Sequence, residues 1–461
     1  MLIQFRVGNY RSFKDPVTLS MEATKLVSQR KALDDNTIFP AGDKLRLLTS
    51  AAIYGANASG KSNLAKAMRF MKHFIENSVQ PQAAKRIEVE PFALNDATLN
   101  EPSFFEIIFR QESVIYRYGF EATPERVTAE WLYATLHVKE VCLFEREGDE
   151  IQCSTRYFKE GIGLEDKTRS NVLFLSVAAA FNGQRSQQIF QWLDNLMITS
   201  GLEDASLCEY TLKYLQDRAV SHNIVAFIKN LDLDIEDVTV DEQEPCRRQA
   251  EDGQGADIVF KVSESSISYQ VPGRTKRIST TQSETVLAEQ YKGISTTHRR
   301  YDAQGNPSGL DLFTLERHES EGTRRLFALS GPIIDALRYG KVLIIDEFDA
   351  RLHPLISYEL INYFNSKETN PNHAQLIFMT HDTNLLDKDR LRRDQIWFTE
   401  KDKYGATSLY SLAEFKVRND ASYERDYIAG KYGAIPFLGG ACRLTEARNG
   451  EEVEAQRESA G

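Results

Sequence analysis

The sequence has few cysteines, and their spacing does not suggest a metal site. The 461 residues include only 5 cysteines, an odd number, and these are widely scattered. A structural zinc site needs closely spaced cysteines and a disulfide framework needs paired ones, so we expect neither. Isolated thiols are typical of a reducing compartment, and the sequence therefore predicts a cytoplasmic protein.

The chain also lacks an excess of positive charge. It contains 56 Lys and Arg against 67 Asp and Glu, which gives a formal net charge of -11. A protein that holds nucleic acid mainly through its overall charge needs the opposite balance, although a local basic patch would escape this average. Nucleic acid is therefore not the expected partner, and whether DNA is bound stays open at this point.

Long apolar runs are absent as well. No run approaches the length that spans a bilayer, and the N-terminal stretch "MLIQFRVGNYRSF" alternates like a strand and has no apolar signal-peptide core. Hydrophobic residues make up 41% of the chain, which is enough for a packed core. We therefore expect a globular protein of about two or three domains that does not contact a membrane.

The first third of the chain reads as an α/β unit followed by a β lobe. Short apolar or alternating runs at 2–7, 17–21 and 47–54 predict strands, and 61–77 has helical periodicity. The segment 103–147 is rich in aromatic and β-branched residues with turn signals between its runs, which predicts an antiparallel sheet.

The middle of the chain has a different character. Residues 170–231 show helical periodicity without sustained heptads, and 232–307 contains polar, short strand-like pieces. Its basic pairs, such as Arg247-Arg248, Lys276-Arg277 and Arg299-Arg300, fit solvated loop charges better than a nucleic-acid or partner contact. The α/β pattern resumes at 315, so the predicted class is α/β with a mixed sheet, an antiparallel β lobe and an inserted, largely helical domain.

The predicted domains follow from this pattern. The N-terminal half of the main unit, with the β lobe, takes 1–165, the inserted domain 166–310 and the C-terminal half 311–442. The remaining residues, 443–461, lack apolar anchors, and we expect them to be disordered.

The stretch "YGANASGKSN" matches the phosphate loop G-x-x-x-x-G-K-[ST]. It follows an apolar run and opens a helical one, the context that this motif requires. Its backbone N–H groups would face phosphate oxygens, Lys61 would bridge the β- and γ-phosphates, and Ser62 would ligate Mg²⁺. A chance match in a Gly/Ser/Asn turn is the competing interpretation, and Asn57 is equally a γ-phosphate ligand or a turn former. The predicted ATP-binding residues here are Asn57, Ala58, Ser59, Gly60, Lys61, Ser62 and Asn63.

Two further strand ends carry polar side chains. In "KVLIIDEFDARLHP", Asp346 and Glu347 follow a buried run, so Asp346 would hold Mg²⁺ and Glu347 would orient and deprotonate the attacking water. Acids that merely end a strand in solvent are the alternative. In "LIFMTHDTNLL", His381 would hydrogen-bond a γ-phosphate, although a histidine at a strand end is usually structural.

A glycine stands in the first turn of another predicted helix. In "LERHESEGTRRLFALSGPIIDAL", apolar residues recur at helical spacing after Ser320-Glu321-Gly322. Ser320 alone would cap the helix, and Gly322 disfavours it, so its presence calls for another reason.

These motifs together resemble the ABC-type ATPases of the SMC, RecF and OLD-like group, over residues 2–75 and 315–386. The resemblance rests on the stretches "FRVGNYRSFKD", "GANASGKSN", "SEG", "LIIDEFDARLHP" and "FMTHD". "DEFDARLHP", "MTHDTNLLD" and "YIAGKYGAIPFLGG" are similar to the branch found in bacterial abortive-infection and anti-phage systems. The resemblance implies an ABC-type P-loop head that binds ATP and Mg²⁺, with Arg11 and Ser12 near the nucleotide.

The resemblance also implies how such heads work. Two heads hold ATP between them, and Ser320 and Gly322 would form the signature motif that contacts the γ-phosphate on the other head. A glycine lets the helix start approach that phosphate, and the Glu321 carboxylate is expected to point away from it.

The implied function is an ATPase that forms a homodimer through its heads, with higher oligomers left open, and acts as a switch in anti-phage defence. A separately encoded toxic effector, expected to be a nuclease, would be its partner, and a phage-derived trigger is compatible with this role. We expect no nuclease activity in this chain, because no acidic nuclease cluster follows Asp382. The alternative is a RecF-like DNA-binding ATPase in repair or replication.

Overall fold

The computed structural model describes residues 1–42, 44–80, 86–136, 138–202, 204–231, 235–240, 259–263, 266–271, 274–278, 293–418 and 421–436. The tail 443–461, expected to be disordered, and the basic pair Arg247-Arg248 lie outside the described residues. Within these ranges, no helix is both long and apolar enough to cross a membrane.

The central layer is a six-stranded sheet in the order β11-β18-β19-β5-β20-β21, parallel except for β21. The three strands in its middle are buried along their whole length, as is typical of parallel strands covered on both faces. This confirms the predicted mixed α/β sheet. Its strands are β5 (Ser50–Tyr54), β11 (Leu196–Ser200), β18 (Val342–Asp346), β19 (Gln375–Met379), β20 (Ile396–Lys401) and β21 (Thr407–Ser411).

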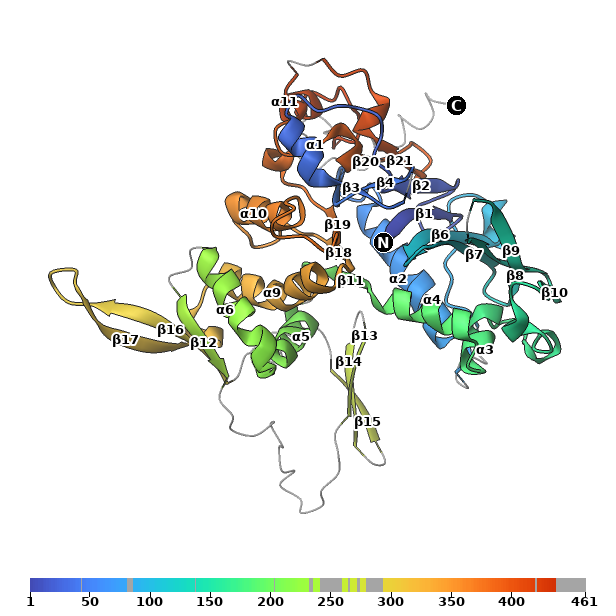
Figure 1. Ribbon diagram of the computed structural model, residues 1–461, viewed down its shortest axis with the longest axis horizontal. Helices are drawn as coiled ribbons and strands as arrows, with labels where there is room; N and C mark the ends of the chain where they lie inside the picture. Colours follow the sequence, from blue (N-terminus) through green and yellow to red (C-terminus); the bar gives the residue numbers. More distant parts are fainter. Residues whose placement is uncertain are drawn as a thin grey trace, which may run out of the picture.

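Alternate residues of the central strands belong to two separate cores. On β5, Ala51 and Ile53 pack with α2 (Lys61–Asn77) and the antiparallel sheet, whereas Ala52 and Tyr54 pack on the opposite side. That second core contains the helices α5 (Asp204–Gln216), α6 (Arg218–Asn230), α9 (Glu321–Tyr339), α10 (Pro354–Phe364) and α11 (Tyr423–Ile428). The sheet is therefore sandwiched, with the β lobe on one side and the helices on the other (Figure 1).

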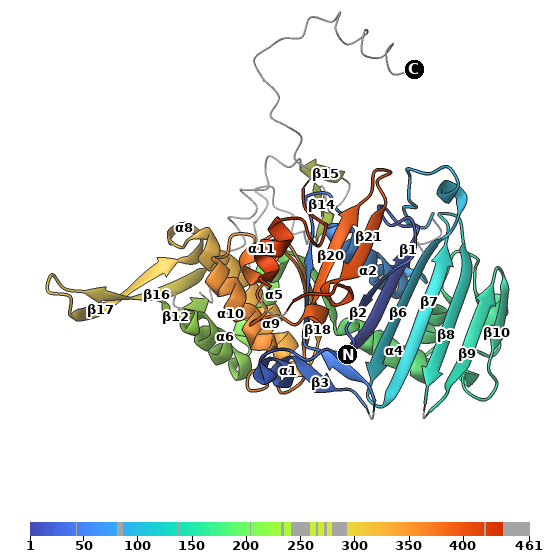
Figure 2. The same ribbon diagram turned by 90° about the horizontal axis from the view of Figure 1, so that it is seen from above.

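The β lobe is a seven-stranded antiparallel sheet in the order β10-β9-β8-β7-β6-β1-β2. It confirms the antiparallel sheet predicted over 103–147 and adds the two N-terminal strands at its edge (Figure 2). Its strands are β1 (Leu2–Gly8), β2 (Val17–Ser20), β6 (Ser103–Gln111), β7 (Val114–Ala122), β8 (Val127–Thr135), β9 (Glu140–Glu147) and β10 (Glu150–Cys153).

The middle of the chain is helical, as expected, but not only an insertion. α3 (Phe174–Ala180) and α4 (Gln184–Asp194) pack into the core shared with the β lobe, and β11 pairs in parallel with β18. The range 166–310, expected to be an inserted domain, therefore supplies a strand of the central sheet. The run "LMITS" that forms β11 is too short for its pairing to be read from the sequence.

α5 supports α9 at a proline. Pro332 lies inside α9 and has no N–H to donate to the carbonyl of Ala328. The buried hydroxyl of Thr211 on α5 donates to Ala328 O at 2.9 Å and accepts from Gly331 N at 3.1 Å. A side chain from the neighbouring helix thus fills the gap that the proline leaves in the backbone ladder.

A smaller sheet projects from the helical side. Its order is β12-β16-β17, and the hairpin of β16 and β17 points away from the body (Figures 1 and 2). Its strands are β12 (Ile235–Val240), β16 (Ile294–Tyr301) and β17 (Pro307–Thr314). A separate antiparallel sheet consists of β13 (Val259–Ser263), β14 (Ser266–Val271) and β15 (Arg274–Ile278). The remaining short elements are α1 (Lys31–Thr37), β3 (Ile38–Pro40), β4 (Arg46–Leu48) and α8 (Leu315–His318).

Candidate functional site

The predicted phosphate loop lies between β5 and α2. β5 ends at Tyr54 and α2 begins at Lys61. Gly60 caps α2 with a φ of +113°, a conformation that favours glycine. A Cβ on Gly60 would also lie 2.5 Å from Thr407 Oγ1. The sharp turn into the helix therefore requires glycine at this position.

The loop is braced by two threonines from the far end of the sequence. Asn57 and Ala58 are exposed at the loop tip, whereas Ser59 is buried. The hydroxyls of Ser59 and Thr399 lie 2.7 Å apart, and Thr407 Oγ1 donates to Ser59 O at 2.8 Å. β20 and β21 thus fix the shape of the loop.

The turn after β1 reaches the phosphate loop through one of the two residues predicted to lie near the nucleotide. Ser12 Oγ accepts from Asn63 Nδ2 at 2.8 Å, and Ser12 O accepts from Thr407 N at 2.7 Å. The guanidinium of Arg11 instead pairs with Glu90, with 2.7 Å between Nη2 and Oε1. The structure brings Ser12 against the first turn of α2 and directs Arg11 toward Glu90.

Lys61 is buried inside the loop. Its ammonium donates to Gly55 O at 2.7 Å and to Ala56 O at 3.1 Å. Burial lowers the pKa of Lys61 to about 8, and three nearby carboxylates oppose this shift. The carboxylates belong to Asp346, Asp349 and Glu347.

The acidic pair lies at the carboxyl end of β18, as predicted. Asp346 is largely buried, and its Oδ1 accepts from the N–H of Glu347 at 3.1 Å. Glu347 has a φ of +51°, an uncommon conformation for a residue with a side chain. The N–H of Gly201, just after β11, donates to Asp346 O at 2.6 Å, and a Cβ on Gly201 would lie only 1.9 Å from Glu347 O. The end of β11 therefore holds the backbone of Glu347 in place.

His381 lies beyond the end of β19, near the same group of charges. Its backbone N–H donates to Asp349 Oδ1 at 3.3 Å. Partial desolvation, and then the positive charge of Lys61, lower the pKa of His381, while Asp349 and Asp346 oppose the shift. The structure thus brings together Lys61, the acids that follow β18 and His381.

The donor set of this edge suits a magnesium nucleotide. Phosphate oxygens suit the buried ammonium of Lys61 and the free N–H groups at the start of α2. The Ser62 hydroxyl and the Asp346 carboxylate offer oxygen atoms, the hard ligands that Mg²⁺ prefers. The described residues contain no group of three or more His, Cys, Asp and Glu side chains that would hold a metal alone. Mg²⁺ bound with a nucleotide needs one or two protein oxygens besides phosphates and water, so Ser62 and Asp346 would fit that ion.

The predicted signature segment opens α9. Ser320 is the N-cap, and its Oγ accepts from the N–H of Thr323 at 3.1 Å. A Cβ on Gly322 would lie 3.0 Å from Arg351 O, so a contact within this chain already favours glycine there. The Glu321 carboxylate lies 3.6 Å from Arg351 Nε. The helix start is thus joined to the loop that follows β18.

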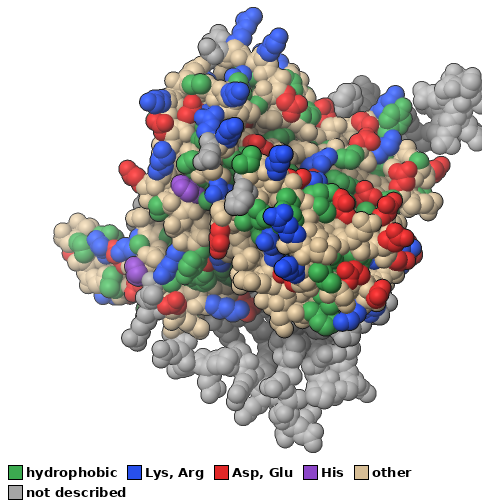
Figure 3. Space-filling view, turned by 45° about the vertical axis from the view of Figure 1, so that its right-hand side comes forward, with side chains coloured by type: hydrophobic (Ala, Val, Ile, Leu, Met, Phe, Trp, Pro, Cys, Tyr) green, Lys and Arg blue, Asp and Glu red, His purple; other side chains and the backbone are tan. Residues whose placement is uncertain are grey.

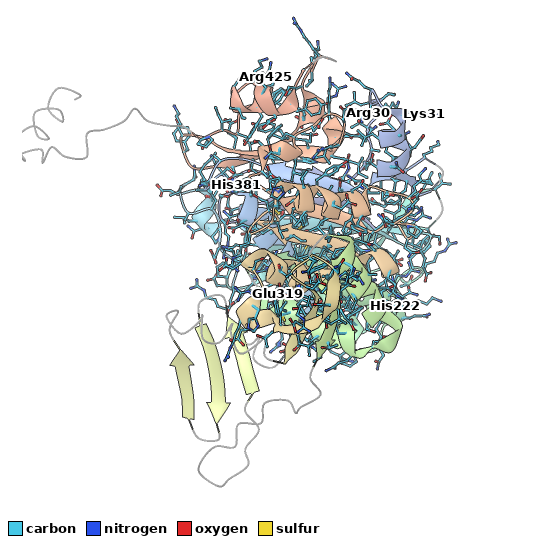
Figure 4. All side chains as sticks on the ribbon, turned by 90° about the vertical axis from the view of Figure 1, so that its left-hand side faces the viewer. Arg30, Lys31, His222, Glu319, His381 and Arg425 are labelled. Atoms are coloured by element: carbon cyan, nitrogen blue, oxygen red, sulfur yellow. The ribbon has the colours of Figure 1, made fainter. Side chains whose placement is uncertain are left out.

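The residue before the signature is anchored to the projecting sheet. Glu319 Oε1 accepts from Thr296 Oγ1 at 2.5 Å and lies 2.6 Å from His298 Nε2. Figure 4 places Glu319 below His381 in the view. β16 therefore fixes the chain just before Ser320.

Several residues of the site carry no recognisable sequence signal. Thr399 and Thr407 stand in ordinary strand patterns, and Gly201 follows a short apolar run. Asp349 is not among the predicted site residues, although it lies in the same "DEFD" stretch as the acidic pair. Its spacing of three residues from Asp346 is the one signal that could have identified it.

Comparisons with known proteins identify one family that covers most of the chain. The family described as "AAA domain, putative AbiEii toxin, Type IV TA system" matches residues 50–387, most of the chain. No curated protein matches. Among solved structures, the SMC head domain from Thermotoga maritima is 14% identical, with a TM-score of 0.36 over 89% of this chain and 98% of that one. The SmcHead bound to the C-winged helix domain of ScpA is 12% identical, with a TM-score of 0.35 over 89% and 97%.

Proposed function

The chain belongs to this AAA-domain family, and from that premise we propose that it is an ATP-driven switch. The family match confirms the resemblance to abortive-infection ATPases predicted from the sequence. In our proposal the chain binds and hydrolyses ATP, its heads associate when ATP is bound, and this association controls a separately encoded toxic effector in anti-phage defence.

The observation that carries the proposal is the grouping of Lys61 with the acids after β18 and with His381. Lys61 and the N–H groups of the loop would bind the β- and γ-phosphates. Asp346 and Ser62 would hold Mg²⁺, which neutralises phosphate charge when bound. Glu347 would take a proton from the attacking water, because its backbone is held at the edge where the γ-phosphate would lie.

His381 would report whether the γ-phosphate is present. Its pKa is lowered, so near neutral pH the imidazole is mainly uncharged and can donate one hydrogen bond to a phosphate oxygen. Its backbone is held by Asp349. Loss of the γ-phosphate would remove this contact and allow the loop to relax.

Association of the heads would complete the site. The N–H groups of Glu321 and Gly322 have no acceptor within α9, because the first turn of any helix lacks one. Ser320 and Gly322 would therefore offer donors to the γ-phosphate of ATP on a second copy of this chain. Such a homodimer couples ATP occupancy to quaternary state.

The defence role is supported by the family description, which names both a putative toxin and a type IV TA system. We place the toxic activity, expected to be that of a nuclease, in a separate cytoplasmic effector and the ATP switch in this chain. Expressing the chain alone and together with proteins encoded beside it, followed by phage challenge, tests this division. Growth arrest by the chain alone, or cleavage of DNA or RNA by the purified chain with Mg²⁺, would contradict it.

The RecF-like alternative finds less support in the charges. Arg299 pairs with Glu236 at 2.5 Å and Arg300 with Asp311 at 3.6 Å, so this basic pair is neutralised within the projecting sheet. On the face shown in Figure 3, Lys and Arg side chains are interspersed with Asp and Glu. The alternative predicts ATP-dependent, salt-sensitive binding of duplex DNA, which a titration at two salt concentrations would reveal.

ATP turnover is the direct test of the site. The wild-type chain should hydrolyse MgATP, and Lys61→Ala should lose ATP binding because the loop loses its only buried ammonium among the described residues. Glu347→Gln should keep ATP binding and lose turnover. Normal turnover in Glu347→Gln would show that Glu347 does not activate the water.

A further inference from the structure

An ion pair joins the signature segment to the loop that follows β18. Glu321, the first residue of α9, lies with Oε2 3.6 Å from Arg351 Nε. Arg351 follows Asp349 by two positions. The pair therefore connects the helix start proposed to meet ATP on another head with the loop that carries the acids of this head.

The backbone on the Arg351 side is fixed in an unusual conformation. Arg351 has a φ of +63°, which a side-chain-bearing residue adopts at a cost. This conformation sets its carbonyl 3.0 Å from the position of a Cβ on Gly322. The N–H of Leu352 donates to Asp349 O at 3.2 Å and closes the turn. The carbonyl and the guanidinium of Arg351 thus both lie against the first turn of α9.

The charge of Glu321 is otherwise unfavourable for the proposed role. The N-terminus of α9 offers N–H donors and a positive dipole end to an anion, but the Glu321 carboxylate stands in the same turn. A negative charge there would repel a triphosphate. A cation beside the carboxylate cancels much of that repulsion.

We propose that Arg351 is a positioning residue that pairs with Glu321 and so permits the start of α9 to bind the γ-phosphate of ATP on a second copy of this chain. The inference rests on the proposed head association. Arg351 acts by neutralising the charge of Glu321 and not by contacting the nucleotide.

Stability alone gives little reason for such a pair. The side chains of Arg351 and Glu321 are 41% and 66% exposed, and ion pairs this exposed contribute little to folding. A variant that loses the arginine should therefore fold normally and still bind less well to ATP-loaded partners. Alanine would have to adopt the same positive φ, so Arg351→Ala leaves the backbone requirement unchanged.

The test uses the full chain and two readouts, the ATP concentration that gives half-maximal association and the KM for ATP. Arg351→Ala should raise both values on the order of tenfold. This factor corresponds to the repulsion energy between two unit charges about 6 Å apart in a medium between protein and water. Arg351→Lys should stay close to wild type. Adding Glu321→Gln to Arg351→Ala should restore both values, because the repulsive charge is then absent. Arg86→Ala, which breaks another exposed pair, with Glu125, is the control and should change neither value.

Three outcomes would overturn the inference. Wild-type behaviour of Arg351→Ala would show that the pair has no role. Failure of Glu321→Gln to restore the double variant would show that Arg351 acts directly or only holds the fold, and a lowered melting temperature would identify the second case. If the wild-type chain neither associates with ATP nor hydrolyses it, the proposed function itself fails, and the inference falls with it.

Discussion

Replacing Gly201 with alanine should abolish most ATP turnover and leave ATP binding nearly intact. Gly201 follows β11 and lies against the backbone of the proposed catalytic residue, Glu347. None of the three atoms nearest to a Cβ at this position belongs to the phosphate loop, which would bind ATP. The variant therefore separates placement of Glu347 from nucleotide binding.

The expected magnitude follows from the contact distances. A Cβ on Gly201 would lie 1.9 Å from Glu347 O, 2.8 Å from Glu347 C and 3.1 Å from Asp346 O. All three atoms are backbone, so no side chain can turn away. A carbon normally stays about 3.3 Å from a carbonyl oxygen, so the two segments must move apart by about 1.4 Å, the difference from the 1.9 Å contact. A misplacement of about 1 Å in a catalytic group costs on the order of 10²-fold in rate.

The assay is steady-state ATP turnover combined with ATP titration and thermal unfolding. Gly201→Ala should show a kcat about 10²-fold below wild type with a Kd for ATP within a few-fold of it. Gly163→Ala is the control: its φ of +80° disfavours alanine, but a Cβ there would meet no atom within 4 Å, so this variant should lose some stability and keep wild-type turnover. Wild-type turnover in a folded Gly201→Ala variant would refute the argument that β11 positions Glu347.

Three further predictions concern other parts of the chain. Because burial lowers the pKa of Lys61 to about 8, its charged fraction in the free chain falls as the pH rises through that value. The Kd for ATP should therefore rise by up to about tenfold per pH unit above about 8. A Kd that does not change with pH in calorimetric titrations would contradict this. Asp349→Asn weakens the acceptor for the His381 N–H and should lower kcat by roughly tenfold, the effect of about 1.4 kcal/mol, with little change in ATP binding. Thr211→Val removes the hydroxyl that bridges the gap at Pro332 and should lower the free energy of unfolding by about 1–3 kcal/mol in urea titrations, whereas Thr211→Ser should recover most of it.

Local signals made much of the fold predictable. The helix predicted over 61–77 is α2, and Pro354 opens α10 as its preference for the first helical position suggests. The buried runs before the phosphate loop, before Asp346 and before His381 are three neighbouring strands of one sheet. Each of these features depends on residues within one short segment.

Long-range partners were not predictable in the same way. Thr399 and Thr407 reach the phosphate loop from more than 300 positions away, and no residue pattern marks a threonine as a loop brace. β11 pairs with β18 although a helical segment and the projecting sheet separate them in sequence. The partner of Glu321 was equally hidden, because it depends on how the loop after β18 folds back onto α9.

The reason for Gly322 illustrates the difference. The sequence predicts that this glycine lets a second head approach the helix start, and this stays a prediction. The structure supplies a nearer reason, since a Cβ at this position would lie only 3.0 Å from Arg351 O. Both reasons can hold at once, and substituting Gly322 would not separate them.

The measurement that tests the central claim most directly is the molar mass of Glu347→Gln in solution, with and without MgATP. This variant should bind ATP and hydrolyse it slowly, so an ATP-bound pair of heads should persist. The mass should double when MgATP is added, and it should stay that of the nucleotide-free protein when Ser320→Arg is added to block the start of α9. An unchanged mass at ATP concentrations that saturate the variant, or an unimpaired dimer with Ser320→Arg, would contradict ATP-driven association through the signature segment.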